Sequence, residues 1–101
     1  MENKKKCLCK LIGAKVKYYR TICGIPVGGL SQADVAQKAN LHAETISRLE
    51  RGDYNDTIPL STLVDIADAL GIEISLLLNM SQADRELIHW DELENPNGGG
   101  D

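Results

Sequence analysis

Apolar residues recur at helical spacing along most of the chain, and no stretch shows the strict alternation of a half-buried strand. A first helix over residues 10–23 would place the following residues near one face: Leu11, Ile12, Val16, Tyr19 and Cys23. The segment Gly-Ile-Pro-Val-Gly-Gly at 24–29 ends this helix, because proline and several glycines do not continue a helix. The pattern therefore predicts an all-α fold.

A pair of short helices follows this break. Ser31 is a good N-cap for the second helix, because its hydroxyl can accept an orphan backbone N–H, and Asp34 adds favourable negative charge to the first turn. Asn40 tolerates the left-handed conformation and is expected to end the helix sharply. His42 then takes the cap position of the third helix, over residues 43–51. The predicted core positions of the pair are Ala33, Ala36, Ala39, Ile46 and Leu49.

The fourth helix is predicted to begin at or near Pro59, whose missing N–H costs nothing in a first turn, and Gly71 ends it. Its apolar stripe consists of Leu60, Leu63, Val64, Ala67 and Leu70. A short fifth helix is indicated by Ile74, Leu77 and Leu78.

Both ends of the chain are expected to lie outside this core. Residues 81–94 form a predicted sixth helix, with Ser81 as its cap and with Leu87 and Trp90 as packing positions. The tail at 95–101 is rich in glycine, has nothing to bury and is expected to be disordered. Residues 1–9 are interpreted as a basic flexible arm.

Length and composition limit the function classes. The chain has 101 residues, of which 43% are hydrophobic, so it suits a single domain with a core of its own. Three cysteines (Cys7, Cys9 and Cys23) without a signal-peptide h-region favour reduced thiols and a cytoplasmic location. No Cys/His pair with ligand spacing follows Cys9, so no metal site is predicted, and no apolar run is long enough to span a membrane.

The charge is distributed unevenly. The formal net charge is −4, which by itself disfavours nucleic acid as a partner. Residues 1–20 nevertheless carry seven Lys/Arg against Glu2 alone, whereas residues 59–101 carry nine Asp/Glu against Arg85 alone. The asymmetry permits one basic face and one acidic end. Taken alone, the run Lys4–Lys6 is interpreted as a solvated charge run.

The third helix, in Asn-Leu-His-Ala-Glu-Thr-Ile-Ser-Arg-Leu-Glu-Arg-Gly at 40–52, has few apolar positions. One narrow stripe would dock it on a core and leave polar side chains turned outward. The second helix, a turn of about three residues and this helix have the layout of a helix-turn-helix, whose second helix enters the major groove of DNA. Ala36 and Ala39 permit a close approach of the two helices, and Leu41 can fill the angle between them.

These residues resemble a known family. SQADVAQKANLHAETISRLERG at 31–52 is similar to the lambda-repressor/Cro-like, or XRE, helix-turn-helix, and LSTLVDIADALGIEISLLL at 60–78 resembles its fourth and fifth helices. The resemblance covers residues 10–78 and implies a compact five-helix DNA-binding domain. Residues 79–94 would then be a C-terminal helical extension, following the arm at 1–9 and the domain at 10–78.

The resemblance also implies roles for individual residues. Arg48 can donate a bidentate pair to guanine, Thr45 can contact a thymine methyl or a phosphate, and Glu44 can accept from cytosine N4. The full set of implied DNA-binding residues is Gln32, His42, Ala43, Glu44, Thr45, Ser47, Arg48, Lys15, Lys17, Asn55 and Thr57, together with the Lys4–Lys6 arm for backbone contacts. Arg20 and Glu50 match a structural pair that links the first helix to the third.

The sequence departs from the family pattern in three places. The segment between Arg20 and Ser31 is longer by about five residues, and the role of its Gly24–Gly29 loop stays open. Asn40 stands in the turn where the family usually has glycine. His42 replaces the usual Ser or Thr cap, which weakens the cap but lets an imidazolium reach a phosphate.

Two functions of different classes remain open. The first is a sequence-specific transcriptional regulator of the repressor type, which binds double-stranded DNA as a homodimer on a palindromic operator, with residues 72–94 as its dimer surface. The second is a protein-interaction module such as an antitoxin-like partner, in which the acidic C-terminal half binds a basic protein. No catalytic ordering of Ser, Cys, His or Asp and no phosphate loop is evident, so neither an enzyme nor a cofactor is predicted.

Overall fold

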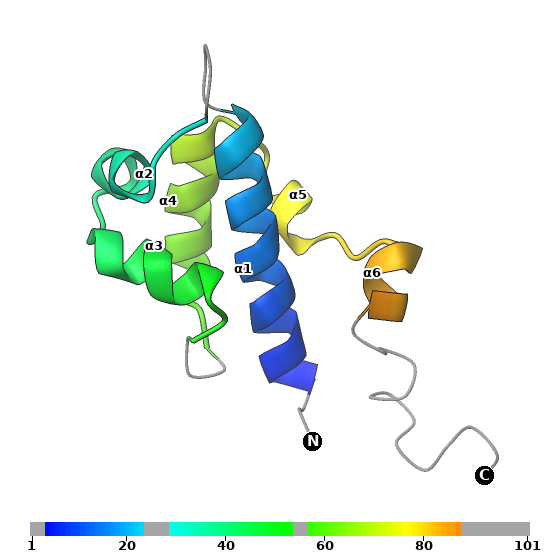
Figure 1. Cartoon of the computed structure of the whole chain (residues 1–101). Coiled ribbons are helices and arrows are strands. Elements are labelled where there is room, and N and C mark those ends of the chain that lie inside the picture. Colours follow the sequence, from blue (N-terminus) through cyan, green and yellow to red (C-terminus); the bar gives the residue numbers. More distant parts are fainter. Residues whose placement is uncertain (1–3, 24–28, 54–56, 88–101) are drawn as a thin grey trace, which may run out of the picture.

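Helices account for all the regular structure in the part of the chain that the computed structural model describes, residues 4–23, 29–53 and 57–87. In chain order they are α1 (Lys4–Cys23), α2 (Gln32–Ala39), α3 (Ala43–Glu50), α4 (Leu60–Leu70), α5 (Ser75–Leu78) and α6 (Gln82–Leu87). Figure 1 shows α1 and α4 side by side, α2 and α3 on one flank and α5 and α6 on the other. The prediction of an all-α fold is confirmed.

The ends of α2 follow from their sequence. The Asp34 N–H donates to Ser31 Oγ at 2.9 Å, and the Ser31 N–H donates to the Asp34 carboxylate at 3.1 Å. This reciprocal capping box satisfies two orphan donors and lowers the pKa of Asp34. At the other end, Asn40 adopts φ 58°, ψ 45° and turns the chain toward α3. Gly71 ends α4 in the same left-handed region, as predicted.

The core forms where α1, α2, α3 and α4 meet. Its largest fully buried side chains are Ile46, Leu49, Ile66, Leu77, Val16 and Val35. α2 packs on both α3 and α4, while α1 packs on α3, α4 and α5. The helices α1 to α5 therefore each contribute buried residues, and the cluster is almost entirely aliphatic, as the scarcity of aromatic residues requires.

The helix α1 begins six residues earlier than predicted. Lys4–Lys6 are helical, and Cys7, Cys9 and Leu11 are buried. The interpretation of residues 1–9 as a flexible arm is therefore wrong for residues 4–9, while residues 1–3 lie outside the described part. The two cysteines and Leu11 provide the apolar contacts that hold these extra turns in place.

Several predicted core positions are exposed instead. Ala33 is exposed on α2, whose buried residues are Val35, Ala36 and Ala39. In α4 the buried face comprises Leu63, Ile66, Ala67 and Leu70, whereas Leu60 is 62% exposed and Val64 40% exposed. The stripe predicted for α4 is therefore rotated by part of a turn.

The sixth helix is attached to the rest through few contacts. None of the residues of α6 is buried, and Leu87, expected to pack, is 73% exposed. The helix has its own capping box, in which the Asp84 N–H donates to Ser81 Oγ and the Ser81 N–H donates to Asp84. The predicted helical residues 88–94, with Trp90, and the tail at 95–101 lie outside the described residues.

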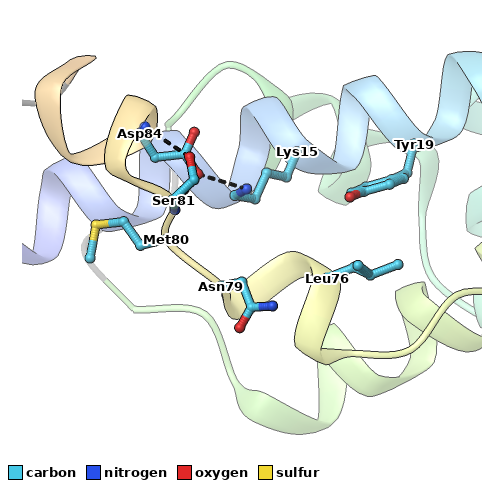
Figure 2. A pocket seen from close by; sticks show the side chains of 7 residues that line it. All are labelled: Lys15, Tyr19, Leu76, Asn79, Met80, Ser81 and Asp84. Carbon is cyan, nitrogen blue, oxygen red and sulfur yellow. Dashed lines mark hydrogen bonds and ion pairs between the residues drawn. The ribbon is translucent and has the colours of Figure 1, made fainter.

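An ion pair joins α6 to α1. Lys15 Nζ lies 3.0 Å from Asp84 Oδ2, beside an open pocket that Tyr19, Leu76, Asn79, Met80 and Ser81 also line (Figure 2). The hydrogen bond from the Ser81 backbone and then the Lys15 ammonium lower the pKa of Asp84. Because the folded-state pKa is lowered, this carboxylate stabilises the fold above its unfolded pKa, and the contribution is lost as pH falls through the folded pKa.

Gly13 sets the distance between α1 and α3. A Cβ at this position would overlap the Leu49 carbonyl oxygen and contact the Glu50 Cα. Alanine in place of glycine normally stabilises a helix interior by about 0.5–1 kcal/mol. Here the missing side chain is what allows the two backbones to touch.

We expect Gly13→Ala to destabilise the protein by about 1–3 kcal/mol, because the overlapping atom belongs to backbone that cannot move aside without shifting α3. The free energy of unfolding in urea, followed by circular dichroism, tests this. The neighbouring exposed Ala14, changed to glycine, is the control and should cost only the propensity term of about 0.5–1 kcal/mol. A Gly13→Ala protein as stable as the wild type would contradict the close approach.

Candidate nucleic-acid interface

One side of α3 is embedded in the protein and the opposite side is open. Ile46 and Leu49 are fully buried and anchor the helix. The residues that reach the outer surface are Ala43, Glu44, Arg48 and the C-cap residue Arg51, with Ser47 half-buried beside them. This arrangement leaves a polar surface of short and long side chains, about two helical turns in length.

The side chains on this outer face contact one another. Arg51 Nη1 donates to Ser47 Oγ at 2.7 Å, and Arg51 Nη2 lies 3.4 Å from a Glu44 carboxylate oxygen and 3.7 Å from Asp53 Oδ2. Arg48 Nη2 donates to the Asp53 carbonyl at 3.4 Å. The network was not predicted from the sequence. The 44, 47, 51 spacing, which puts three side chains on one helix face, is the signal that could have revealed it.

The orientation of α3 depends on the pair expected between Arg20 and Glu50, which is present. Arg20 Nε and Nη2 donate to the two carboxylate oxygens of Glu50 at 2.7 and 2.9 Å, and Nη1 donates to the Leu30 carbonyl at 2.8 Å. Side-chain exposure is 13% for Arg20 and 4% for Glu50. The hydrogen bonds to Glu50 raise the pKa of Arg20.

Gln32 is tied to the same carboxylate. At the start of α2, its Nε2 donates to Glu50 Oε1 at 3.0 Å. The amide therefore lies between α2 and α3, half-buried, with its oxygen not used in this contact. Gln32 is therefore located on the side of α2 that contacts the end of α3.

The other predicted residues are distributed around α3. His42 is exposed at the N-cap and makes no side-chain cap hydrogen bond, and Thr45 is half-buried in the first turn. Thr57 is exposed before α4, and Asn55 lies outside the described residues.

Lys15 and Lys17 are separated by the geometry of α1. Gly13 marks the side of α1 that touches α3, and Lys17, four residues later, lies near that side and is exposed. Lys15 lies on the opposite side, is paired with Asp84 of α6 and has a side-chain exposure of only 19% (Figure 2). The structure therefore does not bring Lys15 to the surface that contains α3.

Other classes of site find no support in the described residues. The thiols of Cys7 and Cys9 are buried and not in a disulfide. Within residues 4–23, 29–53 and 57–87, no three His, Cys, Asp or Glu side chains gather as a metal site would require. None of the helices in these ranges has the length and apolar character to cross a bilayer.

Comparison with known proteins agrees with the geometry. A family model described as helix-turn-helix matches residues 28–77, which include α2 to α4 and most of α5. Residues 28–77 form a helix-turn-helix of the lambda-repressor/Cro-like (XRE) family. This membership supports DNA-binding transcription regulation as its class of function.

One relative among curated proteins is the immunity repressor protein of Bacillus phage phi105, 43% identical over 49 residues. The match covers 48% of this chain and 33% of the relative, so the chain spans about a third of that protein's length. No solved structure gives a significant match.

We expect Arg20→Met to lower the free energy of unfolding by about 3–5 kcal/mol, because it leaves the buried Glu50 carboxylate without its charged partner. Urea denaturation measures the loss. The double variant Arg20→Met with Glu50→Met should regain most of it, since a buried pair can be replaced by apolar side chains at little cost.

The matched control is Arg51→Met, which removes an arginine from exposed ion pairs and should cost less than about 1 kcal/mol. Equal losses in the two single variants would show that the Arg20–Glu50 pair does not hold α1 against α3.

Proposed function

We propose that this protein is a transcriptional repressor that inserts α3 into the major groove as a homodimer on a palindromic operator. The observation that supports this most strongly is the two-sided character of α3, in which Ile46 and Leu49 hold the helix and the opposite face is exposed and polar. A helix held by so narrow a stripe can enter a groove without losing its packing.

The outer face has the chemistry that reading bases requires. Arg48 presents donors for guanine O6 and N7, and Glu44 presents acceptors for an exocyclic amino group. Thr45 and Ala43, in the first turn, are small enough to let the backbone approach a thymine methyl. These assignments come from exposure and position on α3 and from the family pattern.

Backbone contacts would surround this face. Gln32 contacts the end of α3, Ser47 lies on it, His42 is exposed at its N-cap, and Thr57 is exposed before α4. Lys17 and the exposed lysines of the first turns of α1 supply positive charge on the adjoining helix, while Asn55 stays a prediction. We leave Lys15 out of the interface because it pairs with Asp84 on the other side of α1.

The two-fold arrangement is the second part of the proposal. A single recognition helix reads few base pairs, and a symmetric dimer doubles the contacts on a site of matching symmetry. The segment 72–94 was predicted as the dimer surface, and its described part exposes Leu76, Leu78 and Leu87 on α5 and α6. The DNA-binding unit proposed at 10–78 gains the first turns of α1, and residues 79–94 remain a separate extension.

A protein-interaction module on the same fold is the alternative. Its support is the same exposed apolar surface beside the acidic residues Glu73 and Glu86. Binding to a basic protein through this surface would leave α3 uninvolved. The two functions can therefore be separated by substitutions: changes in α3 would impair DNA binding, whereas changes in α5 or α6 would impair binding of a protein partner.

We expect the protein to bind duplex DNA from upstream of its own gene more tightly than a scrambled duplex, and Arg48→Ala to reduce that preference at least tenfold, because the bidentate pair to guanine is worth about 1–3 kcal/mol. Fluorescence anisotropy measures both affinities. Lys38→Ala removes a positive charge from an exposed position in the last turn of α2, outside both proposed contact surfaces, and should leave the preference unchanged.

The same titration, repeated over a range of salt concentrations, separates Lys17 from Lys15. Lys17→Met should reduce the slope of log K against log salt by about one, whereas Lys15→Met should leave it unchanged. Weak binding to both duplexes, with no effect of Arg48→Ala, would contradict the proposal for that site and favour a protein partner, which a pull-down would then identify.

For the dimer, we expect sedimentation equilibrium to show self-association, and Leu78→Arg to weaken it at least tenfold. In a symmetric apolar contact the introduced arginine of one subunit would lie close to the same arginine of the other, and the two charges would repel. Leu60→Arg changes an exposed leucine on α4, outside this segment, and serves as the control. A wild-type protein that is monomeric and binds its operator one to one would contradict the dimer.

A further inference from the structure

Arg51 lies across the outer face of α3 and connects residues from both turns of the helix. Its two terminal nitrogens have different partners. Nη1 donates to Ser47 Oγ at 2.7 Å, while Nη2 lies 3.4 Å from Glu44 Oε1 and 3.7 Å from Asp53 Oδ2. The fork geometry of a guanidinium permits this, because its donors point in fixed directions.

We propose that Arg51 is a positioning residue that sets which base α3 prefers, by fixing the donor and acceptor pattern that Ser47 and Glu44 present to the groove. The inference rests on the proposed function and deepens it. It concerns specificity at one operator position, whereas the bulk of the affinity comes from Arg48 and the backbone contacts.

The hydroxyl of Ser47 is constrained by what arginine can do. A guanidinium has no acceptor, so Ser47 Oγ must accept from Arg51. The hydroxyl hydrogen of Ser47 is then free to point outward as a donor. Without Arg51 the same hydroxyl could rotate to accept or donate, and it would distinguish bases poorly.

The carboxylate of Glu44 is constrained in the same way. Its Oε1 accepts from Arg51 at 3.4 Å, which leaves the other oxygen as an acceptor for a base. Acceptors select an exocyclic amino group, which adenine carries at N6 and cytosine at N4, and reject the carbonyl of guanine or thymine. The network therefore favours an amino base over a keto base at one position.

Charge is the second reason for this arrangement. Glu44 is 69% exposed at the end of α3 that faces the groove, where DNA phosphates would repel it. In the free protein its pair with Arg51 contributes little, because both side chains are solvated. Once the groove closes over them and excludes water, the same pair strengthens and offsets the repulsion.

The test measures binding of the full chain to the operator and to each of its single-base variants, by competition anisotropy. The wild type should prefer an amino base by about tenfold at one position. Arg51→Met should reduce that ratio to less than about twofold, with the ratios at other positions unchanged. Arg51→Lys keeps the charge but not the fork, so it should keep most of the overall affinity and still lose the ratio.

Two further proteins complete the design. Glu44→Gln should lose the same ratio, and combining it with Arg51→Met should cost little more than either change alone, because both act at one position. Lys38→Met, which removes an exposed positive charge in the last turn of α2, is the charge control and should retain the ratio.

The outcomes separate this inference from the proposed function. Ratios that Arg51→Met lowers equally at every position, or not at all, would overturn the positioning role and leave the proposed function standing. A wild-type protein without preference for any duplex would overturn both.

Discussion

The bidentate contact between Arg20 and Glu50 orients α3, whose outer face is the proposed DNA-binding surface. One guanidinium joins the end of α1 to the end of α3 and, through the Leu30 carbonyl, to the entry of α2. The carboxylate that it holds also accepts from Gln32, so three elements converge on one charge pair. Lysine could not make these contacts, because a point charge cannot fill two parallel hydrogen bonds and a third at an angle.

Gly13 acts together with this pair. It brings the middle of α1 against the end of α3. Arg20, two turns closer to the C-terminus of α1, binds Glu50 in the same part of α3. Two contacts along one helix define a direction as well as a distance. The tilt of α3 therefore depends on α1, a helix outside the helix-turn-helix, as well as on its packing against α2.

Local chemistry made much of the fold predictable. Ser31 with Asp34, Asn40 and Gly71 mark helix ends by mechanisms that need no tertiary contact, and each occurs as predicted. The Arg20–Glu50 pair was predicted from the family pattern, since the two residues are 30 positions apart and no local rule relates them. The sequence did not predict the environment of residues that are equally compatible with a buried and an exposed position.

The start of α1 is one such position. Lys4–Lys6 are compatible with a solvated arm or a solvated helical turn, and only the burial of Cys7, Cys9 and Leu11 decides between them. Ala33 suits a core or a surface equally well, and Lys15 and Lys17 look alike in sequence although they lie on different sides of α1. The role of Arg51 depends on rotamers that spacing alone does not specify.

The ion pair between Lys15 and Asp84 has a consequence for cooperativity. None of the residues of α6 is buried and this pair joins the helix to α1, whereas α2, α3 and α4 share a continuous apolar core. The molecule thus contains two units with different free energies of opening. Amide hydrogens of α6 can exchange through local opening, at salt-dependent rates, while those of α3 exchange only when the whole domain unfolds. A C-terminal element that detaches so easily can change partners without disturbing the helices that would hold DNA.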